Sequence, residues 1–148
     1  MKKKTTKDIV QIFAKAQGIL NGTYIRKKQK RNGKIFRENQ EVTFNKVSKT
    51  EADLFLKKHG INVKDYIRTM NLEQTLHVLK RHPNMTIADF LIISTIINDR
   101  DICGLGRAEN TIVYKKTLAD EYFYIEFIQH GKKKLALKTF YKKKAISK

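Results

Sequence analysis

The chain has 148 residues, with 32 Lys and Arg against 14 Asp and Glu, so its formal net charge is +18 at pH 7. An apolar fraction of 41% is enough for one compact core, which argues against disorder throughout the chain. The single cysteine, Cys103, excludes an internal disulfide, and no segment approaches the roughly 20 apolar residues that a membrane span needs. We therefore expect a basic cytoplasmic protein that binds a polyanion.

The first 44 residues are predicted to form a helix and then a basic hairpin. Thr5 and Asp8 resemble a capping box, and apolar residues recur at helical spacing until Asn21-Gly22. Asn32-Gly33 lies between two extended segments and predicts a hairpin turn. The basic residues around this turn form either a mobile arm that grips phosphates or a solvated loop. The candidate RNA-binding residues here are Arg26, Lys27, Lys28, Lys30, Arg31 and Lys34.

Four more helices are predicted in the middle of the chain, from their capping residues. Ser48 opens the first, which Gly60 closes, and Asn62 caps the second. The third ends before Pro83, because the residue preceding a proline is pushed out of helical geometry. Thr86 opens the fourth with a capping box. The four helices are expected over residues 49–59, 63–70, 72–81 and 87–97.

The apolar period changes to two beyond Gly106, which indicates strands. Three antiparallel strands are predicted, over residues 111–117, 122–129 and 134–141. Simple alternation along the last strand places Leu135, Leu137, Thr139 and Tyr141 on one face. Helices followed by an antiparallel sheet predict an α+β protein, with the N-terminal helices packed on the C-terminal sheet.

Two imidazoles and two fixed cations lie close together near the end of the predicted helix over residues 72–81. His77 and His82 are five residues apart, about 140° of rotation on an ideal helix, so they do not face one metal ion. We therefore expect no metal and no cofactor. Either histidine can move protons near neutral pH, and Lys80 and Arg81 can neutralise a phosphate. The helix dipole favours protonated His82, whereas the two cations oppose it. The alternative is that His77 is a half-buried structural residue and His82 only ends the helix.

Three polar residues of the predicted sheet complete the candidate site. Thr139 and Tyr141 point the same way, so a hydroxyl and a phenol are available to a phosphate, and the ring can stack on an unpaired base. Lys115 can reach the same surface from a neighbouring strand and face the developing phosphorane. Ordinary sheet packing, and a solvated lysine at the sheet edge, are the alternatives.

The order of these features resembles a known nuclease family over roughly residues 42 to 142. The motifs that carry the resemblance are Lys46-Val47-Ser48, His77, Lys80-Arg81-His82, Thr86-x-x-Asp89, Tyr114-Lys115 and Lys138-Thr139-Phe140-Tyr141. They are similar to the phage and mobile-element members of the barnase/EndoU/colicin/RelE nuclease superfamily. The resemblance implies helices on an antiparallel sheet of about four strands, with a metal-independent ribonuclease site on the sheet surface. It matches His77 and His82 to the family's helix histidines, Lys115 to its central-strand lysine, and Thr139 and Tyr141 to its terminal-strand polar residues.

We therefore predict an extension over residues 1–44 and a nuclease domain over residues 45–148. The predicted function is a metal-independent endoribonuclease that cleaves RNA, for example transfer RNA, by transesterification through the 2′-OH. It would act as a toxin or as a phage factor for host takeover, with Lys80, Arg81 and the hairpin on the RNA backbone. An acidic immunity or antitoxin protein is a candidate partner.

Two other functions remain open from the sequence. One is a non-enzymatic basic phage protein that binds nucleic acid or inhibits a host defence complex, because fold does not dictate function. The other is a peripheral membrane protein, which is disfavoured because the first helix lacks a basic polar face opposite its apolar one.

Overall fold

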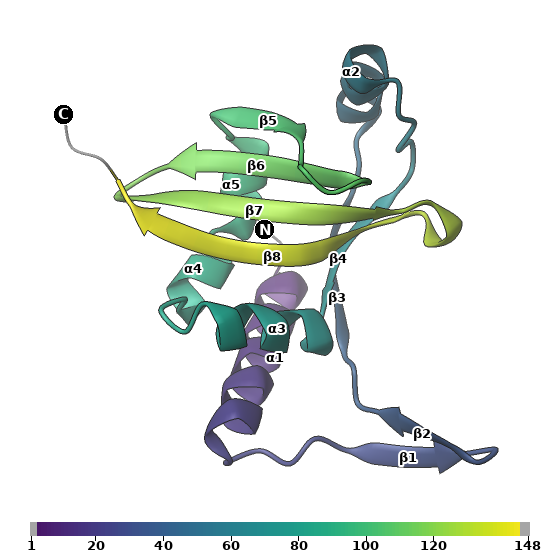
Figure 1. The fold of residues 1–148 in the computed structure, drawn as a ribbon, viewed down its shortest axis with the longest axis vertical. Coiled ribbons are helices and arrows are strands. Elements are labelled where there is room, and N and C mark those ends of the chain that lie inside the picture. The colour runs from purple at the N-terminus through teal and green to yellow at the C-terminus, as the bar shows by residue number, and fades with distance from the viewer. Residues whose placement is uncertain (1–2, 146–148) are drawn as a thin grey trace.

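The computed structural model describes residues 3–145, which form an α+β fold. In this part of the chain, all the α-helices precede the last four strands (Figure 1). The elements are α1 (Lys3–Asn21), β1 (Lys28–Arg31), β2 (Lys34–Arg37), β3 (Glu41–Lys46), α2 (Lys49–His59), β4 (Ile67–Asn71), α3 (Leu72–Arg81), α4 (Ile87–Leu91), α5 (Ile93–Asn98), β5 (Ile102–Leu105), β6 (Thr111–Thr117), β7 (Asp120–Gln129), the 3₁₀ helix η1 (His130–Lys132) and β8 (Lys134–Lys144).

The main sheet has six strands in the order β3-β4-β8-β7-β6-β5. All neighbouring strands are antiparallel except β4 and β8, which pair in parallel only over Lys134–Ala136 of β8. The α+β class with N-terminal helices is confirmed, whereas the expectation of about four antiparallel strands was not exact, because the sheet has six strands and one parallel pair. The sheet is mixed because β4 enters beside β8 from the helical half of the chain.

The strand β4 replaces the predicted helix over residues 63–70. The side chain of Asn62 accepts a hydrogen bond only from the Lys64 amide, at 2.9 Å, which makes a single turn. Asp65 then adopts a left-handed conformation with φ of 64°, which an α-helix cannot continue through. Ile67 and Met70, two of the apolar residues that suggested a helix, therefore enter the sheet, and Met70 becomes fully buried there.

The other local predictions from the capping residues have mixed outcomes. Ser48 and Gly60 cap α2 as expected: the Ser48 side chain accepts from the Glu51 amide, and Gly60 has φ of 71°. Thr5 does not cap α1, because the helix starts two residues earlier and Thr5 is buried inside it. The helix predicted over residues 87–97 is divided into α4 and α5 at Ile92.

One hydrophobic core joins α1 to the helices and strands that follow. Phe13 of α1 meets Phe90 of α4 edge to face, with ring centroids 5.1 Å apart, and Phe90 meets Phe140 of β8 at 5.4 Å. In Figure 1, α5 lies behind β6 and β7, while α3 and α1 lie below β8. The N-terminal helix thus packs against the later part of the chain, and the division into two parts at residue 44 stays a prediction. No helix within residues 3–145 is long and apolar enough to cross a membrane.

A β-bulge in β8 decides which side chains reach the open face of the sheet. Ile125 pairs with Thr139 but Glu126 pairs with Leu137, so Lys138 has no opposite residue. An extra residue shifts the alternation by one. Leu137 is consequently buried under the helices like Phe140, whereas Thr139 and Tyr141 lie on the other face. The prediction that Leu135 and Leu137 share a face with Thr139 and Tyr141 was therefore wrong.

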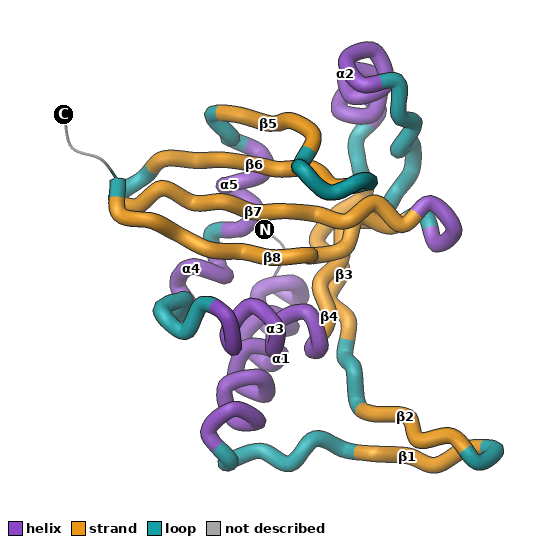
Figure 2. Tube along the Cα trace, in the orientation of Figure 1, coloured by secondary structure: helices purple, strands orange, loops and turns teal. Residues whose placement is uncertain are grey.

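The hairpin β1–β2 forms a separate two-stranded sheet that projects from the body of the molecule (Figure 2). Arg31 pairs with Lys34 across a turn in which Asn32 and Gly33 have φ of 49° and 78°. Positive φ at both positions is the geometry that an Asn-Gly hairpin turn requires, so this prediction is confirmed. Every residue of the two strands is exposed.

Candidate functional site

His82 lies at the C-terminal end of α3, where the helix points its last residues toward β8. A capping box between Asn71 and Gln74 begins the helix, and buried Val78 and Leu79 hold it against the sheet. The amide of His82 donates to the carbonyl of Val78 at 2.7 Å, and Pro83 follows. The imidazole therefore lies just beyond the end of the helix, where it can contact β8.

The imidazole of His82 stacks on the phenol ring of Tyr141, with ring centroids 5.2 Å apart and planes 26° from parallel. Tyr141 in turn stacks on Phe123 of β7, with centroids 4.9 Å apart and planes 14° from parallel. We call His82, Tyr141 and Phe123 the ring row. It runs from the end of α3 across the two central strands, on the face of the sheet that Thr139 also occupies.

Lysines flank the ring row. Lys115 pairs across β6–β7 with Phe123, and its Nζ lies 5.6 Å from the Phe123 ring centroid. The Nζ of Lys143 lies 5.5 Å from the same centroid, and Glu121 forms an ion pair with Lys115 at 3.0 Å. The sequence prediction missed Phe123 and Lys143. Period-two alternation from Lys115 through the β6–β7 turn is the signal that would have found Phe123.

Asp89 holds the start of α4, which follows the short segment after His82. Its carboxylate accepts hydrogen bonds from Lys142 Nζ at 2.8 Å and from the Tyr122 hydroxyl at 2.6 Å, and it also forms the capping box with Thr86. Burial disfavours the charge of Asp89, but these hydrogen bonds outweigh burial and lower its pKa. Because Lys142 follows Tyr141 and Tyr122 precedes Phe123, Asp89 ties the start of α4 to the same two strands, on the face opposite the ring row.

Burial lowers the pKa of His82 below its ordinary value of 6.5, and the positive charges of Arg81 and His77 lower it further. These effects exceed the pull of the helix dipole, which on its own favours the protonated form. The imidazole of His82 is therefore neutral at pH 7, the state in which a histidine accepts a proton.

The five predicted site residues are brought together to different degrees. His82 and Tyr141 are in contact, and Lys115 joins them through Phe123. Thr139 lies two residues before Tyr141 on the same face, and His77 is exposed on α3. Within residues 3–145, no hydrogen bond or ring contact links His77 or Thr139 to the ring row, and no cluster of three or more His, Cys, Asp or Glu is placed to hold a metal ion. The catalytic roles and the metal independence stay predictions.

A cluster around Glu38 anchors the hairpin. Glu38 accepts hydrogen bonds from Lys15 Nζ at 2.9 Å, from the Tyr24 hydroxyl at 2.7 Å and from the Lys27 amide at 3.3 Å. Burial raises the pKa of Glu38, but these hydrogen bonds prevail and lower it to about 2. Arg26 also serves this anchor, since it pairs with Glu73 at 2.6 Å. The exposed basic side chains of the hairpin segment are Lys27, Lys28, Lys30, Arg31, Lys34 and Arg37, and Lys80 and Arg81 are exposed at the end of α3.

Behind the sheet, buried charges form a second cluster. Arg68 of β4 is 1% exposed, and its Nε donates to Glu126 of β7 at 2.6 Å. Its other nitrogens donate to the Tyr114 hydroxyl at 3.0 Å and to Asn45 at 3.1 Å. Burial raises the pKa of Glu126, and Arg68 opposes that rise. The remaining oxygen of Glu126, Oε1, has no hydrogen-bond partner within the described chain.

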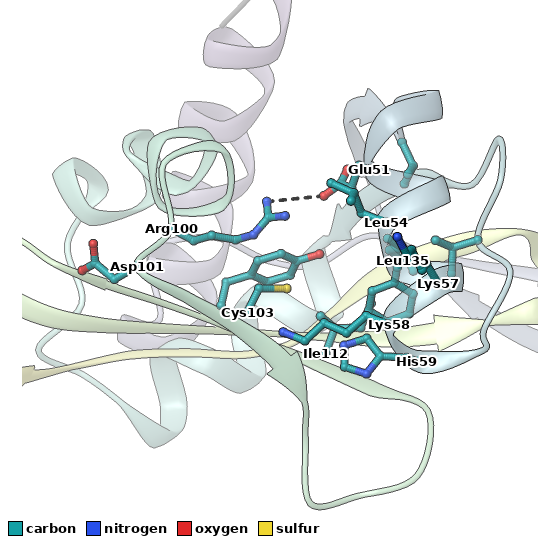
Figure 3. A pocket seen from close by; sticks show the side chains of 14 residues that line it. Glu51, Leu54, Lys57, Lys58, His59, Arg100, Asp101, Cys103, Ile112 and Leu135 are labelled. Carbon is teal, nitrogen blue, oxygen red and sulfur yellow. Dashed lines mark ion pairs between the residues drawn. The ribbon is translucent and has the colours of Figure 1, made fainter.

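A cleft of about 690 Å³ opens above this cluster, between α2 and the β5–β6 edge of the sheet (Figure 3). Tyr114 lines it, and Arg100 reaches in from the end of α5 to pair with Glu51 of α2 at 3.6 Å. Successive residues of a strand face opposite ways, so Tyr114 and Lys115 lie on opposite faces. The cleft and the ring row are therefore two separate surfaces of one sheet. Sequence reasoning did not find the cleft, because its residues come from four separate segments.

The fold and the ring row define a basic α+β protein with an imidazole, a phenol and lysines on a sheet surface. A family model described as phage-Barnase-EndoU-ColicinE5/D-RelE like nuclease3 matches residues 45–148, which include His82, Lys115 and Tyr141. The chain belongs to this nuclease family, and the resemblance found in its sequence is confirmed. Comparisons with curated proteins and with solved structures gave no match to this chain.

Proposed function

We propose that this nuclease is a metal-independent endoribonuclease whose reaction centre is the ring row. The observation that carries the proposal is the contact between His82 and Tyr141, since it joins a neutral imidazole to a strand phenol beside Lys115. A neutral imidazole, a hydroxyl donor and a fixed cation are the groups that transesterification at a phosphodiester requires.

In the proposed reaction, His82 takes the proton of the ribose 2′-OH, and the 2′ oxygen attacks the adjacent phosphorus. The bond from phosphorus to the 5′ oxygen breaks, and an acid returns a proton to that oxygen. The products are a 2′,3′-cyclic phosphate and a 5′-hydroxyl. His77 is the candidate acid, because it lies close enough to His82 to lower its pKa. Tyr141 and Thr139 would donate hydrogen bonds to the phosphate, and Lys115 would neutralise its developing charge.

The substrate in this proposal is a structured RNA such as transfer RNA. The chain's net charge of +18 favours a polyanion, and the exposed basic residues of the hairpin and of α3 would contact phosphates at a distance from the centre. Cleavage of such an RNA in the cytoplasm of a host or target cell would make the protein a toxin or a host-takeover factor, with an acidic immunity or antitoxin protein as the natural antagonist.

The test is cleavage of total RNA by pure protein in EDTA, with analysis of the product ends. The parental protein should produce 2′,3′-cyclic phosphates, and His82→Ala should slow cleavage by about 10²- to 10⁴-fold, the usual contribution of a general base. His130→Ala is the matched control, because this imidazole bonds to Tyr66 in the turn at the other end of β7 and β8.

Unchanged cleavage by His82→Ala in EDTA would show that the centre lies elsewhere. Binding of RNA by the parental protein without any cleavage would instead favour the alternative function, a non-enzymatic basic protein that holds nucleic acid or inhibits a host defence complex.

A further inference from the structure

The cleft between α2 and the sheet has the size of a small-ligand site and lies away from the ring row. Its volume of about 690 Å³ falls within the range of roughly 300–1,000 Å³ that is usual for such sites. The residues named above as the reaction centre do not line it. The proposed cleavage chemistry therefore leaves this cavity without a role.

The interior of the cleft suits a flat aromatic group. Apolar side chains line it, with Phe55 and Val63 from α2 and the segment after it, and Ile112 and Leu135 from β6 and β8. The Tyr114 ring also lines it, and the guanidinium carbon of Arg100 lies 5.6 Å from the centroid of that ring. Aromatic rings and planar guanidinium groups are the surfaces on which unpaired bases stack.

The rim of the cleft carries lysines that no acidic side chain within residues 3–145 neutralises by an ion pair. Of the two acidic residues that line it, Glu51 is paired with Arg68 and Arg100, and Asp101 accepts from Lys116 and from the Thr117 amide. Lys57 and Lys58 also line the cleft, and neither has an ion-pair partner within residues 3–145. Figure 3 shows Lys58 and His59 on the side opposite Arg100. An anionic group that enters this rim would meet free ammonium groups.

We propose that the cleft binds a nucleotide, with the base between the apolar walls and the phosphate at Lys57 and Lys58. A base next to a phosphate matches both the apolar interior and the cationic rim, whereas a purely apolar ligand would leave the two lysines unused. The nucleotide comes either from an unpaired position of an RNA that wraps round the β5 edge, or from solution as a free mononucleotide. The first source rests on the proposed function, and the second does not.

The single cysteine of the chain gives a direct readout of occupancy. Cys103 lines the cleft and is half-buried, and burial raises the pKa of its thiol. Its alkylation by iodoacetamide is therefore slow, and a ligand bound in the cleft would slow it further. The rate is measured by mass spectrometry for the full chain alone, with a single-stranded oligonucleotide that lacks 2′-OH groups and cannot be cleaved, and with adenosine 5′-monophosphate. We expect at least one of the two ligands to slow alkylation by about five-fold or more at saturation. If only the ligand-free protein reacts, a five-fold decrease in rate corresponds to about four-fifths of the clefts being occupied.

The pattern of protection identifies the source of the nucleotide. Protection by the oligonucleotide alone indicates an RNA strand, and protection by adenosine monophosphate indicates a free nucleotide. Lys58→Ala should lower the affinity of the protecting ligand by about 3- to 10-fold and reduce the slope of log affinity against log salt concentration by about one. Lys49→Ala is the matched control, because this lysine is exposed on the first turn of the same helix and does not line the cleft.

A second readout covers the case in which native Cys103 is too slow to alkylate. The chain has no Trp, so Leu54→Trp, at a cleft-lining position that is 61% exposed, adds the only indole. Its fluorescence should change when either ligand binds. The proposal is overturned if neither ligand protects Cys103 nor alters this fluorescence at concentrations that saturate binding to the protein. Because neither readout involves cleavage, that failure is distinct from failure of the proposed function, which would appear as unchanged cleavage by His82→Ala.

Discussion

His82 is held in its neutral form by its surroundings rather than by its position on the helix. Burial against Tyr141 removes water from the imidazole, and Arg81 and His77 add positive charge beside it. A helix end alone would favour the protonated form, so the neighbours reverse the effect of the dipole. A histidine whose pKa is lowered in this way is suited to the role of the base in the proposed reaction.

Arg81→Gln is predicted to raise the pKa of His82, because it removes one of the charges that lower it. Since only neutral His82 acts as base, the cleavage rate of the parental protein should increase with pH around the pKa of His82, which lies below 6.5. In Arg81→Gln this rise moves to higher pH. Titration of the His82 ring by NMR measures the shift without cleavage. An unchanged His82 titration in the variant would contradict the electrostatic explanation.

The pair formed by Arg68 and Glu126 is predicted to be a stability determinant. Glu126→Ala leaves the Arg68 guanidinium buried without its closest carboxylate, so the free energy of unfolding should fall by about 3–5 kcal/mol. Replacement of both residues, as Arg68→Met with Glu126→Leu, should cost much less, because it removes both charges together. Urea denaturation of the three proteins measures the difference. A loss below about 0.5 kcal/mol in Glu126→Ala would indicate that Glu51, Asn45 and Tyr114 are sufficient for Arg68.

At the scale of elements, the hairpin and the bulge in β8 show how far the sequence predicts this structure. The Asn32-Gly33 turn and the strand over residues 111–117 could be predicted, because local preferences decide them. The bulge at Lys138 could not, because an unpaired residue is fixed by packing on both faces of the sheet. The strand β4 was missed for a related reason: its apolar run fits a helix as well as a buried strand.

The hairpin is predicted to depend on Glu38 for its order. An isolated two-stranded hairpin is only marginally stable in water, so its anchor to Lys15 and Tyr24 matters. Glu38→Gln should speed amide hydrogen exchange in β1 and β2 and leave β6–β8 unchanged. Equal protection of the hairpin in the variant and the parental protein would contradict this. Since the pKa of Glu38 falls from 4.5 to about 2, its stabilising contribution is present above pH 4.5 and is lost as the pH falls toward 2.

At the scale of the molecule, the sheet separates two surfaces of different character. The ring row with its flanking lysines lies on one face, and the cleft beneath α2 lies on the other. The sequence predicted the meeting of His82 with Tyr141, because the helix end and the last strand each carry a recognisable motif. Phe123 was missed, although alternation from Lys115 through the β6–β7 turn would have found it. The cleft could not be predicted, because it depends on the order of strands in the sheet.

The central claim is that His82 takes the 2′-OH proton in a centre shared with Tyr141. The most direct test compares two RNA substrates in single-turnover cleavage, one with the natural 5′ oxygen and one with sulfur at that position, a leaving group that needs no acid. His77→Ala, which removes the candidate acid, should be slow on the oxygen substrate and restored on the sulfur substrate. His82→Ala should remain slow on both, because the 2′-OH still requires a base. Recovery of His82→Ala on the sulfur substrate, or parental rates for this variant on the oxygen substrate, would contradict the assignment.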